Sequence, residues 1–370
     1  MDPEKHVTSK YTLTQNKKTE KIEMEGFRKR FDAWLWGPTS GSDINISLKD
    51  KVVAITGANA GVGKETARDI SKKGGRVIML CRDTEKARSV AKEINDETGN
   101  QVEVVRLDLA SFESIRNCAD YLLEKEDKID ILINNAGVMA CPEMKTKDGL
   151  ELQIGTNHFG HFLLTELLQP LLRKSTTTGF SPRIVVVSSM AHEGPMWPWP
   201  FCLIALGLAL IMPRFVKIYW AMLPRFRMNW DDLHFQKNPG SYRPFIAYSQ
   251  SKLANVLYAK ELSRRVEKDG IRVYCLHPGL INSELWRHHK EKGSIGAFML
   301  APFEYFMKTP FLGAQTSLYC AMDPSIVTET GLYYSDCAVA SPSPVALVEE
   351  DQKKLWKLSE ETVGLTKKRQ

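Results

Sequence analysis

Short runs of β-branched and other apolar residues alternate with longer segments of helical periodicity through most of the chain. Runs that are apolar throughout are typical of strands buried on both faces, which occur mainly in parallel sheets. Strands that alternate with helices favour a sheet covered by helices on both sides. The sequence therefore predicts an α/β fold. The predicted strands are residues 51–56, 76–81, 102–107, 129–133, 183–187 and 272–276, and the predicted helices are residues 64–73, 85–97, 111–124, 163–173 and 251–267.

Composition places the chain among globular proteins. It has 370 residues, of which 43% are hydrophobic and 25% are charged, and this length suits one large domain with additions or two smaller ones. The seven cysteines are scattered and form no C-x-x-C pair, which argues against a disulfide scaffold or a zinc site and favours a reducing compartment. Residues 1–25 lack the apolar centre of a signal peptide, so the protein is not expected to be secreted.

The formal net charge is +6, which is weak evidence for a nucleic-acid partner. No zinc-finger spacing, RNA-binding aromatic signature or basic zipper accompanies it, so nucleic-acid binding is not predicted. The excess is concentrated in residues 196–229, which hold Arg214, Lys217, Arg225 and Arg227 but no acidic residue. Basic residues beside apolar ones favour contact with an anionic membrane surface.

A glycine-rich turn follows the first predicted strand. It runs from Thr56 to Gly63, and the next helix is predicted to open at Lys64. Glycines at this place allow a tight turn and let the backbone approach a pyrophosphate at a helix N-terminus. The alternative is an ordinary strand-to-helix turn. The candidate nucleotide-binding residues here are Gly57, Asn59, Gly61, Val62 and Gly63.

Arg82 stands directly after the second predicted strand. Proteins that prefer NAD usually carry an acidic residue there for the ribose 2′-hydroxyl, whereas a cation suits the 2′-phosphate of NADP. Arg82 therefore favours NADPH/NADP⁺ over NADH, with a solvated surface arginine as the alternative. Lys64 is a second cation nearby and a weaker indication.

The third and fourth predicted strands also end in candidate cofactor residues. Asp108 can accept a hydrogen bond from an adenine amino group, although an aspartate here can equally cap a helix or a turn. Asn135, Ala136 and Gly137 follow the fourth strand, where small residues and amides can line the adenosine ribose. The alternative is again a turn.

A group of four polar residues carries the strongest chemical signal. Ser189 follows the fifth predicted strand, Asn157 lies on the preceding helix, and Tyr248 and Lys252 are four residues apart, so that they share one helix face. A phenol with a pKa near 10 is a poor acid or base at neutral pH, and a neighbouring ammonium is expected to lower that pKa. Ser189 can donate to a carbonyl oxygen while Tyr248 delivers its proton.

These motifs resemble those of the short-chain dehydrogenase/reductase superfamily, and within it they are similar to the retinol dehydrogenases that reduce retinal with NADPH. The resemblance implies a Rossmann-type doubly wound parallel sheet. The sequence predicts a single such domain at residues 47–370, with an apolar insert, behind an N-terminal tail of residues 1–46. The resembling segments are TGANAGVGKETA (56–67), NNAGVM (134–139), KDGLELQIGTNHFGHFLLT (147–165), VVVSSMAH (185–192), YSQSKLAN (248–255), LHPG (276–279) and GAQTSLYCA (313–321).

The resemblance implies a catalytic role for each of the four polar residues. Tyr248 would be the general acid and base, and Lys252 would tune it and hold the nicotinamide ribose. Ser189 would polarise the substrate carbonyl, and Asn157 would hold a water in the proton relay. The histidines on either side of Asn157, which are His158 and His161, are interpreted as packing or helix-surface residues.

Further cofactor contacts are implied after the last predicted strand. Pro278, Gly279 and the residues that follow would cover the nicotinamide. Ser283 stands where the family usually has a threonine that binds the carboxamide. The hydroxyl is kept and a methyl group is lost, so activity is expected to be retained.

The stretch between Ser189 and Tyr248 is longer than is usual for the family, and the excess is an apolar insert at residues 196–228. Its longest apolar run, residues 201–212, would extend about 18 Å as a helix, whereas the hydrocarbon core of a bilayer is about 30 Å thick. The insert either dips into one leaflet, as its tryptophans and cations favour, or forms a lid on the protein. Membrane association is the predicted outcome.

The predicted function is an NADP(H)-dependent oxidoreductase that transfers a hydride between nicotinamide and an apolar aldehyde, ketone or alcohol. The resemblance makes retinal and retinol the leading substrates. The alternatives are another lipid carbonyl, such as a fatty or isoprenoid aldehyde or a steroid, and a catalytically silent membrane-bound scaffold. The predicted location is the cytosolic face of a membrane, foremost the endoplasmic reticulum, and a homo-oligomer is possible.

Overall fold

A computed structural model describes residues 44–176, 181–194, 226–238, 240–282 and 307–366. The chain separates into two units, Met1–Ser40 and Gly41–Gln370, and every described residue belongs to the second. The predicted tail up to residue 43 and most of the predicted insert therefore lie outside the described residues. Among the residues that are described, no helix has both the length and the apolar character needed to cross a bilayer.

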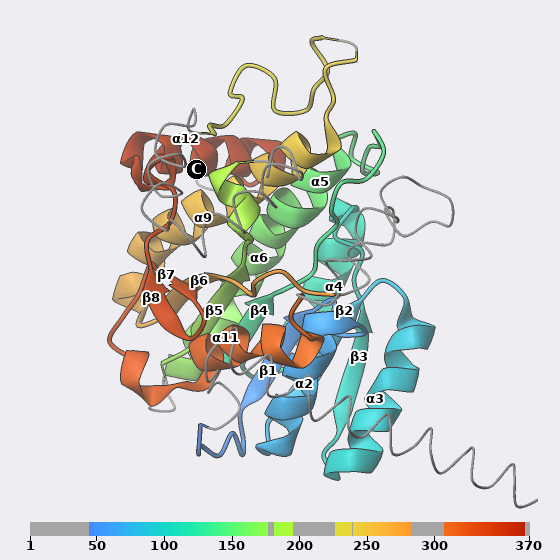
Figure 1. Ribbon diagram of the computed structural model, residues 1–370. Coiled ribbons are helices and arrows are strands. Elements are labelled where there is room, and N and C mark those ends of the chain that lie inside the picture. The colour runs from blue at the N-terminus through green and yellow to red at the C-terminus, as the bar shows by residue number, and fades with distance from the viewer. Residues whose placement is uncertain (1–43, 177–180, 195–225, 239, 283–306, 367–370) are drawn as a thin grey trace, which may run out of the picture. The chain divides into compact units, whose positions relative to one another are not determined.

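Eight strands form one sheet in the order β3-β2-β1-β4-β5-β6-β7-β8 (Figure 1). All neighbouring strands run parallel except β7 and β8, which are antiparallel. The predicted α/β class and the Rossmann-type doubly wound sheet are confirmed. The strands are β1 (Val52–Thr56), β2 (Arg76–Cys81), β3 (Val102–Arg106), β4 (Ile131–Asn134), β5 (Arg183–Val187), β6 (Arg272–His277), β7 (Leu332–Ser335) and β8 (Ala338–Ala340).

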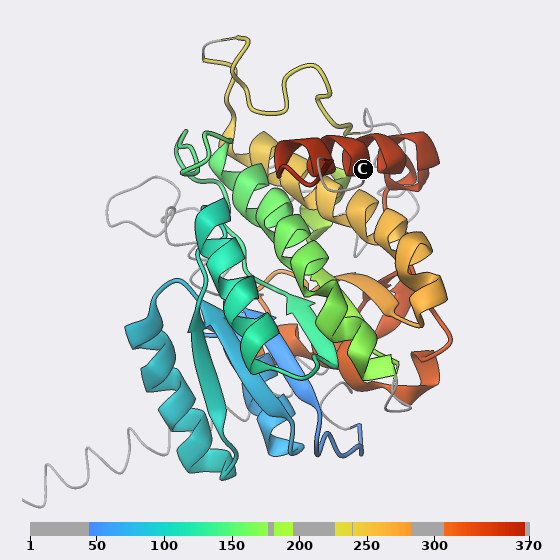
Figure 2. The ribbon, with the colours of Figure 1, turned by 180° about the vertical axis from the view of Figure 1, so that it is seen from behind.

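Helices cover both faces of the sheet, as Figures 1 and 2 show from opposite sides. One face carries α2 (Gly61–Lys72), α3 (Thr84–Thr98) and α11 (Pro310–Met322), and the other carries α4 (Phe112–Lys125), α6 (Gly160–Thr176) and α9 (Pro244–Val266). Each face has its own apolar core, because the strand side chains alternate between the two sides. The central strands β1, β2, β4, β5 and β6 are therefore buried on both faces, as their continuous apolar runs predict.

Helix starts and ends follow local signals in the sequence. Asp83 caps α3 by accepting a hydrogen bond from the backbone N–H of Lys86, and Ser111 caps α4 in the same way through Ser114. Gly99 closes α3 in the left-handed region, at φ 72°. These caps set the ends of the helices that approach the carboxyl ends of β2 and β3.

The helix that carries Tyr248 and Lys252 is longer than predicted. It was expected at residues 251–267, whereas α9 begins at Pro244 and ends at Val266. Pro244 occupies the first turn, where a proline costs no hydrogen bond and its fixed φ suits the helix. As a result, Tyr248 and Lys252 lie on the same regular helix, as their spacing requires.

A further helix, α12 (Glu349–Thr362), packs over α9 and α6 and was not predicted (Figure 2). Its Trp356 is buried against Tyr258, with ring centroids 5.9 Å apart, and against Phe162 at 5.0 Å. The guanidinium of Arg265 lies 4.2 Å from the centroid of the Trp356 ring, at cation–π distance. The C-terminal segment is thus part of the core rather than an appendage.

The predicted insert ends earlier than expected. Phe226 packs against the main core and Met228 is 5% exposed within it, so these two residues belong to the body of the protein. A Cβ added to Gly194 would lie 3.1 Å from Cβ of Phe226. The two described ends of the insert, Gly194 and Phe226, therefore lie next to each other at the surface of the fold.

Candidate active site

The glycine-rich turn joins β1 to α2 at the point where the strand order reverses between β1 and β4. Crevices at such a point, outside the carboxyl ends of the strands, are where α/β sheets bind ligands. Gly57 and Gly61 adopt positive φ angles of 64° and 53°, which other residues adopt at a cost. A Cβ at Gly63 would lie 2.5 Å from the Gly57 carbonyl oxygen, so only glycine fits between the turn and α2.

The N-terminus of α2 is built to receive an anion. The residue before it, Ala60, offers no side chain to cap the helix, and the first turn contains no acidic residue. The backbone N–H groups of this turn and the positive end of the helix dipole therefore face the crevice. This arrangement fits the pyrophosphate of a dinucleotide.

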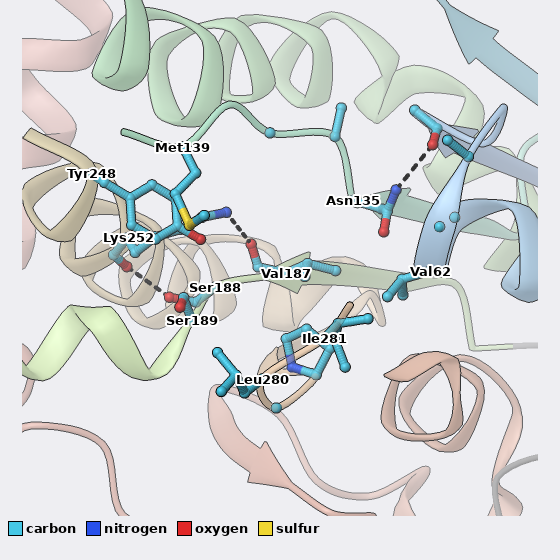
Figure 3. Close-up of a pocket in the computed structure, with 18 of the residues that line it drawn as sticks. Val62, Asn135, Met139, Val187, Ser188, Ser189, Tyr248, Lys252, Leu280 and Ile281 are labelled. Atoms are coloured by element: carbon cyan, nitrogen blue, oxygen red, sulfur yellow. Dashed lines mark hydrogen bonds between the residues drawn. The ribbon is translucent and has the colours of Figure 1, made fainter. Parts of the chain in front are cut away.

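A cavity of about 260 Å³ extends from this turn to the end of β5 and α9 (Figure 3). Val62 and Asn135 lie at one end of the cavity, and Ser189, Tyr248 and Lys252 lie at the other. The predicted site residues that line it are Gly57, Asn59, Gly61, Val62, Gly63, Asn135, Ala136, Gly137, Ser189, Tyr248, Lys252, Pro278 and Gly279.

Ser189, Tyr248 and Lys252 meet as the sequence predicts. The hydroxyl of Ser189 accepts from the backbone N–H of Ala191 at 3.2 Å, and Ser189 and Tyr248 line the same end of the cavity. Lys252 Nζ lies 5.8 Å from the centroid of the Tyr248 ring and donates to the carbonyl oxygen of Val187, at 3.1 Å. Strand β5 and helix α9 therefore place a hydroxyl, a phenol and an ammonium at one end of the cavity.

The predicted direction of the Tyr248 pKa is wrong for the protein on its own. Burial raises the pKa of Tyr248 to about 12, and the nearby Ser189 hydroxyl only partly opposes this rise. The same burial lowers the pKa of the Lys252 ammonium to about 8. Both groups are almost fully buried, and loss of water disfavours phenolate and ammonium alike. At neutral pH the phenol is therefore a proton donor.

Asn157 does not line the cavity but lies directly behind it. It sits in a π-helix, η1 (Gly155–Phe159), between the short helix α5 (Leu152–Ile154) and α6. Its amide accepts from the backbone N–H of Val138 at 2.8 Å and donates to the Val138 carbonyl and the Ser251 hydroxyl, each at 2.9 Å. A single π turn inside a helix often marks a functional site. Here it turns the Asn157 side chain toward the cavity wall.

Thr56 organises the turn after β4, a role that the sequence did not reveal. Its hydroxyl accepts from the backbone N–H groups of Asn135 and Ala136, both at 2.9 Å, and its carbonyl accepts from the side-chain amide of Asn135 at 2.8 Å. The Asn135 amide is therefore turned toward the glycine-rich turn and fixes one wall of the cavity (Figure 3).

Arg82, Asp108 and Lys64 do not line this cavity. Arg82 is exposed after β2. The backbone carbonyl of its neighbour Asp83 accepts from the Asn59 side-chain amide at 3.5 Å, so the loop after β2 adjoins the glycine-rich turn.

The side chain of Asp108 accepts from the backbone N–H of Ala110 at 3.1 Å, as a turn residue does. Asp108 also lines a second cavity of about 500 Å³ between β3 and α4. Lys64 pairs with Glu93 at 2.8 Å, which weakens it as a phosphate ligand.

Pro278 and Gly279 follow β6 and are supported by a lysine that sequence analysis missed. Gly279 has a φ of 92°, and a Cβ there would lie 3.1 Å from the side chain of Lys308. Lys308 is buried, forms an ion pair with Asp336, and bonds through its backbone to Leu280 and Asn282. These contacts hold the Pro278–Gly279 turn in place. Ser283 lies outside the described residues.

A second missed residue, His192, lies behind Ser189. Its Nδ1 donates to the Ser189 carbonyl oxygen at 2.7 Å, and its Nε2 accepts from the backbone N–H of Ser343 at 3.0 Å. Through His192, the backbone of Ser189 is therefore linked to a segment far along the sequence. This contact could not be predicted, because His192 and Ser343 belong to no common local pattern.

Comparison with known proteins agrees with this site. Residues 51–200 match the short chain dehydrogenase family. Retinol dehydrogenase 11 of Homo sapiens is 42% identical over 86% of this chain and 88% of its own length. The chain belongs to the short-chain dehydrogenase/reductase family. Retinol dehydrogenase 13 of Homo sapiens is 40% identical over 86% of each chain, so this short-chain dehydrogenase/reductase is of the retinol dehydrogenase type. It is an oxidoreductase of a family that uses nicotinamide cofactors.

Solved structures agree on the fold of this short-chain dehydrogenase/reductase. An uncharacterized protein of Mycobacterium paratuberculosis superposes with a TM-score of 0.62 at 32% identity, over 87% of this chain and 97% of that one. The RhlG/NADP complex of Pseudomonas aeruginosa superposes with a TM-score of 0.56 at 21% identity, over 78% of this chain and 94% of that one. The second similarity concerns the fold alone.

Proposed function

We propose that this enzyme uses NADPH to reduce an apolar aldehyde, with retinal as the leading substrate, or catalyses the reverse oxidation. The observation that carries the proposal is the single cavity that joins an anion-binding helix N-terminus to Ser189, Tyr248 and Lys252. The similarity to retinol dehydrogenases supports the substrate class. The exposed Arg82, at the end of the strand where NAD-preferring proteins usually carry an acidic residue, supports the choice of NADPH.

The residues of the cavity fit a nicotinamide dinucleotide. The turn between Gly57 and Gly63 would hold the pyrophosphate, the residues Asn135 to Gly137 would line a ribose, and Lys252 would hold the other ribose. Pro278 and Gly279 would lie over the nicotinamide. The cofactor supplies or accepts the hydride when it is bound. The protein must therefore bind the substrate carbonyl beside it and handle a proton.

The proton is handled by Tyr248. In the reductive direction its phenol donates a proton to the carbonyl oxygen of the substrate, while Ser189 donates a hydrogen bond to the same oxygen. The Tyr248 pKa of about 12 keeps the phenol protonated at neutral pH. The Lys252 ammonium, positively charged below its pKa of about 8, then stabilises the phenolate left after proton transfer.

Two other functions compete with this proposal. Reduction of another lipid carbonyl, such as a fatty or isoprenoid aldehyde or a steroid, would use the same groups and differ only in the pocket that receives the chain. A catalytically silent scaffold is disfavoured, because a hydroxyl, a phenol and an ammonium, from Ser189, Tyr248 and Lys252, line one end of the same cavity.

A panel of carbonyl substrates tests these alternatives. The full-length protein in detergent is given NADPH or NADH with all-trans retinal, a fatty aldehyde, an isoprenoid aldehyde or a steroid ketone, and oxidation of the cofactor is followed. We expect the highest kcat/KM for retinal with NADPH. A higher value for another lipid carbonyl would replace the substrate, and no turnover with any of them would favour the scaffold.

We also propose that the insert attaches the enzyme to the cytosolic face of a membrane, foremost the endoplasmic reticulum. The insert combines an apolar run, four tryptophan and tyrosine residues and several cations, and each cation near an anionic surface adds about 1 kcal/mol. It leaves the fold at Gly194, a few residues beyond Ser189. An apolar substrate could then pass from the lipid to the active site without crossing water.

Replacement of residues 196–225 by a short Gly/Ser linker tests the attachment. The linker can be short because Gly194 and Phe226 lie next to each other. We expect the full-length protein to float with anionic liposomes and the variant to stay in the soluble fraction, with NADPH binding unchanged. A control that replaces only Arg214, Lys217 and Arg225 by serine should bind anionic liposomes more weakly. A full-length protein that does not float would favour the lid interpretation.

A further inference from the structure

His161 lies between the glycine-rich turn and Asn157, and each of its two ring nitrogens forms a hydrogen bond there. Its Nε2 is 2.9 Å from the Thr56 hydroxyl oxygen, and its Nδ1 is 3.0 Å from the Asn157 carbonyl oxygen. The side chain is almost fully buried, at 3% exposure. The interpretation of His161 as a packing or surface residue does not account for these two bonds.

The hydrogen bonds around Thr56 fix the protonation of the His161 ring. A hydroxyl has one proton to donate and two lone pairs that accept. Both lone pairs of Thr56 Oγ1 are used by the N–H groups of Asn135 and Ala136. Its proton must then go to His161 Nε2, at 2.9 Å, rather than to the Ile133 carbonyl at 3.5 Å. The ring therefore carries its proton on Nδ1 and donates it to Asn157.

The neutral state of the ring agrees with its surroundings. Burial lowers the pKa of His161 to about 4, and the nearby positive charge of Lys252 acts in the same direction. A doubly protonated ring would place a second donor against Thr56 Oγ1, whose lone pairs are already occupied. The ring thus acts as a fixed link with one acceptor and one donor.

The two bonds of His161 reach two different parts of the site. Through Thr56, the Nε2 bond supports Asn135 and Ala136, which line the cofactor end of the cavity. The Nδ1 bond holds the backbone of Asn157, whose side chain bonds to Val138 and to Ser251, the neighbour of Lys252. A Cβ built on Gly137 would lie 3.3 Å from Asn157 Oδ1 and 3.5 Å from Lys252 Nζ, so the three residues adjoin.

We propose that His161 is a positioning residue with two separable functions: its Nε2 bond supports the cofactor wall, and its Nδ1 bond sets Asn157 and, through it, the surroundings of Lys252. The kinetic test of this proposal rests on the proposed function, because it measures the reduction of retinal. It assigns no contact between His161 and the substrate or the cofactor.

Two substitutions separate the two bonds. In His161→Asn the side-chain amide can take the place of Nδ1 and donate to Asn157, while the bond to Thr56 is lost. In His161→Gln the amide oxygen can take the place of Nε2 and accept from Thr56, while the bond to Asn157 is lost. We expect His161→Asn to raise the Kd for NADPH by about five- to tenfold, as loss of one hydrogen bond does, with kcat within about threefold of the wild type.

His161→Gln should give the opposite pattern. We expect kcat for retinal reduction to fall by about 10-fold to 100-fold, because small misplacements of catalytic groups have effects of this size, while the Kd for NADPH stays within about threefold. The matched control is His158→Gln, which alters a buried histidine next to Asn157 in the π-helix η1 that bonds instead to Ser359 of α12. The control should change stability but neither constant.

The crossed pattern supports the proposal, whereas a parallel change of both constants in both variants, or no change in either, would overturn it. A third measurement does not depend on catalytic activity. In ¹⁵N-histidine NMR spectra of the wild-type protein, assigned by the loss of a signal in His161→Gln, we expect His161 to carry its proton on Nδ1. A proton on Nε2 would overturn the proposal. If retinal is not reduced at all, the proposed function fails while the NADPH binding and NMR results still decide the role of His161.

Discussion

Tyr248→Phe is expected to lower the rate of carbonyl reduction by a factor between about 10² and 10⁴, the range typical of a lost general acid. The substitution removes the one hydroxyl that can protonate the substrate oxygen and keeps the aromatic ring that packs in the cavity wall. Because the glycine-rich turn lies at the other end of the cavity, the Kd for NADPH should change little. Single-turnover reduction of retinal, with the Kd measured separately, is the appropriate measurement.

A matched control for this prediction is Tyr258→Phe. Tyr258 is a buried tyrosine of the same helix, α9, but it packs against Trp356 of α12 instead of facing the cavity. The control loses the same hydroxyl from the same helix and should keep wild-type turnover. Wild-type turnover in Tyr248→Phe itself would contradict the assignment of the acid.

Arg82→Ala is expected to raise the Kd for NADPH by about 10-fold to 100-fold, since a hydrogen-bonded charge pair contributes roughly 1.5–3 kcal/mol. The Kd for NADH should change by no more than about twofold, because NADH lacks the 2′-phosphate that the guanidinium would bind. Arg82 is exposed beside the loop that contains Asn59, so its loss leaves the core intact. The Kd values for both cofactors and both proteins, measured at one salt concentration, test the prediction.

Arg88→Ala provides the control for charge. Arg88 is also exposed and lies one turn further along, on α3, so its removal changes the net charge equally without removing the residue after β2. If Arg88→Ala weakens NADPH binding as much as Arg82→Ala does, the effect is general electrostatics and not recognition of the 2′-phosphate.

The parts of the fold that could be predicted are those encoded over short distances. The strands from β1 to β6 are mostly apolar runs, and their observed ends lie within two residues of the predicted ones. The glycine-rich turn, the Asn135–Gly137 turn and Ser189 follow such strands directly, so the carboxyl edge of the parallel sheet brings them together. Tyr248 and Lys252 were predictable because their spacing is that of one helical turn.

The last part of the sheet was not predictable in the same way. Strands β7 and β8 are four and three residues long, too short for an alternation of polar and apolar residues to be recognised. The turn between them, Asp336 and Cys337, has positive φ angles of 51° and 58° without the glycine that usually announces such a turn. Short strands with an unusual turn leave almost no local signal.

The residues behind the site escaped prediction for a different reason. Lys308, His161 and His192 act through bonds to segments far away in the sequence, such as Asp336, Thr56 and Ser343. The wrong direction for the Tyr248 pKa has a related cause: spacing shows that an ammonium is near the phenol, but burial, which has the larger effect, depends on the whole fold.

Helix α12 also has a consequence for synthesis of the protein. It follows every other described helix and strand along the chain, so it is the last of them to leave the ribosome. Until Trp356 docks, the apolar outer faces of α6 and α9, including Phe162 and Tyr258, have no cover from it. Nascent chains with exposed apolar surface are prone to aggregate and are bound by chaperones. We therefore expect chaperones to stay bound to the new chain until α12, residues 349–362, has left the ribosome and packed on α9.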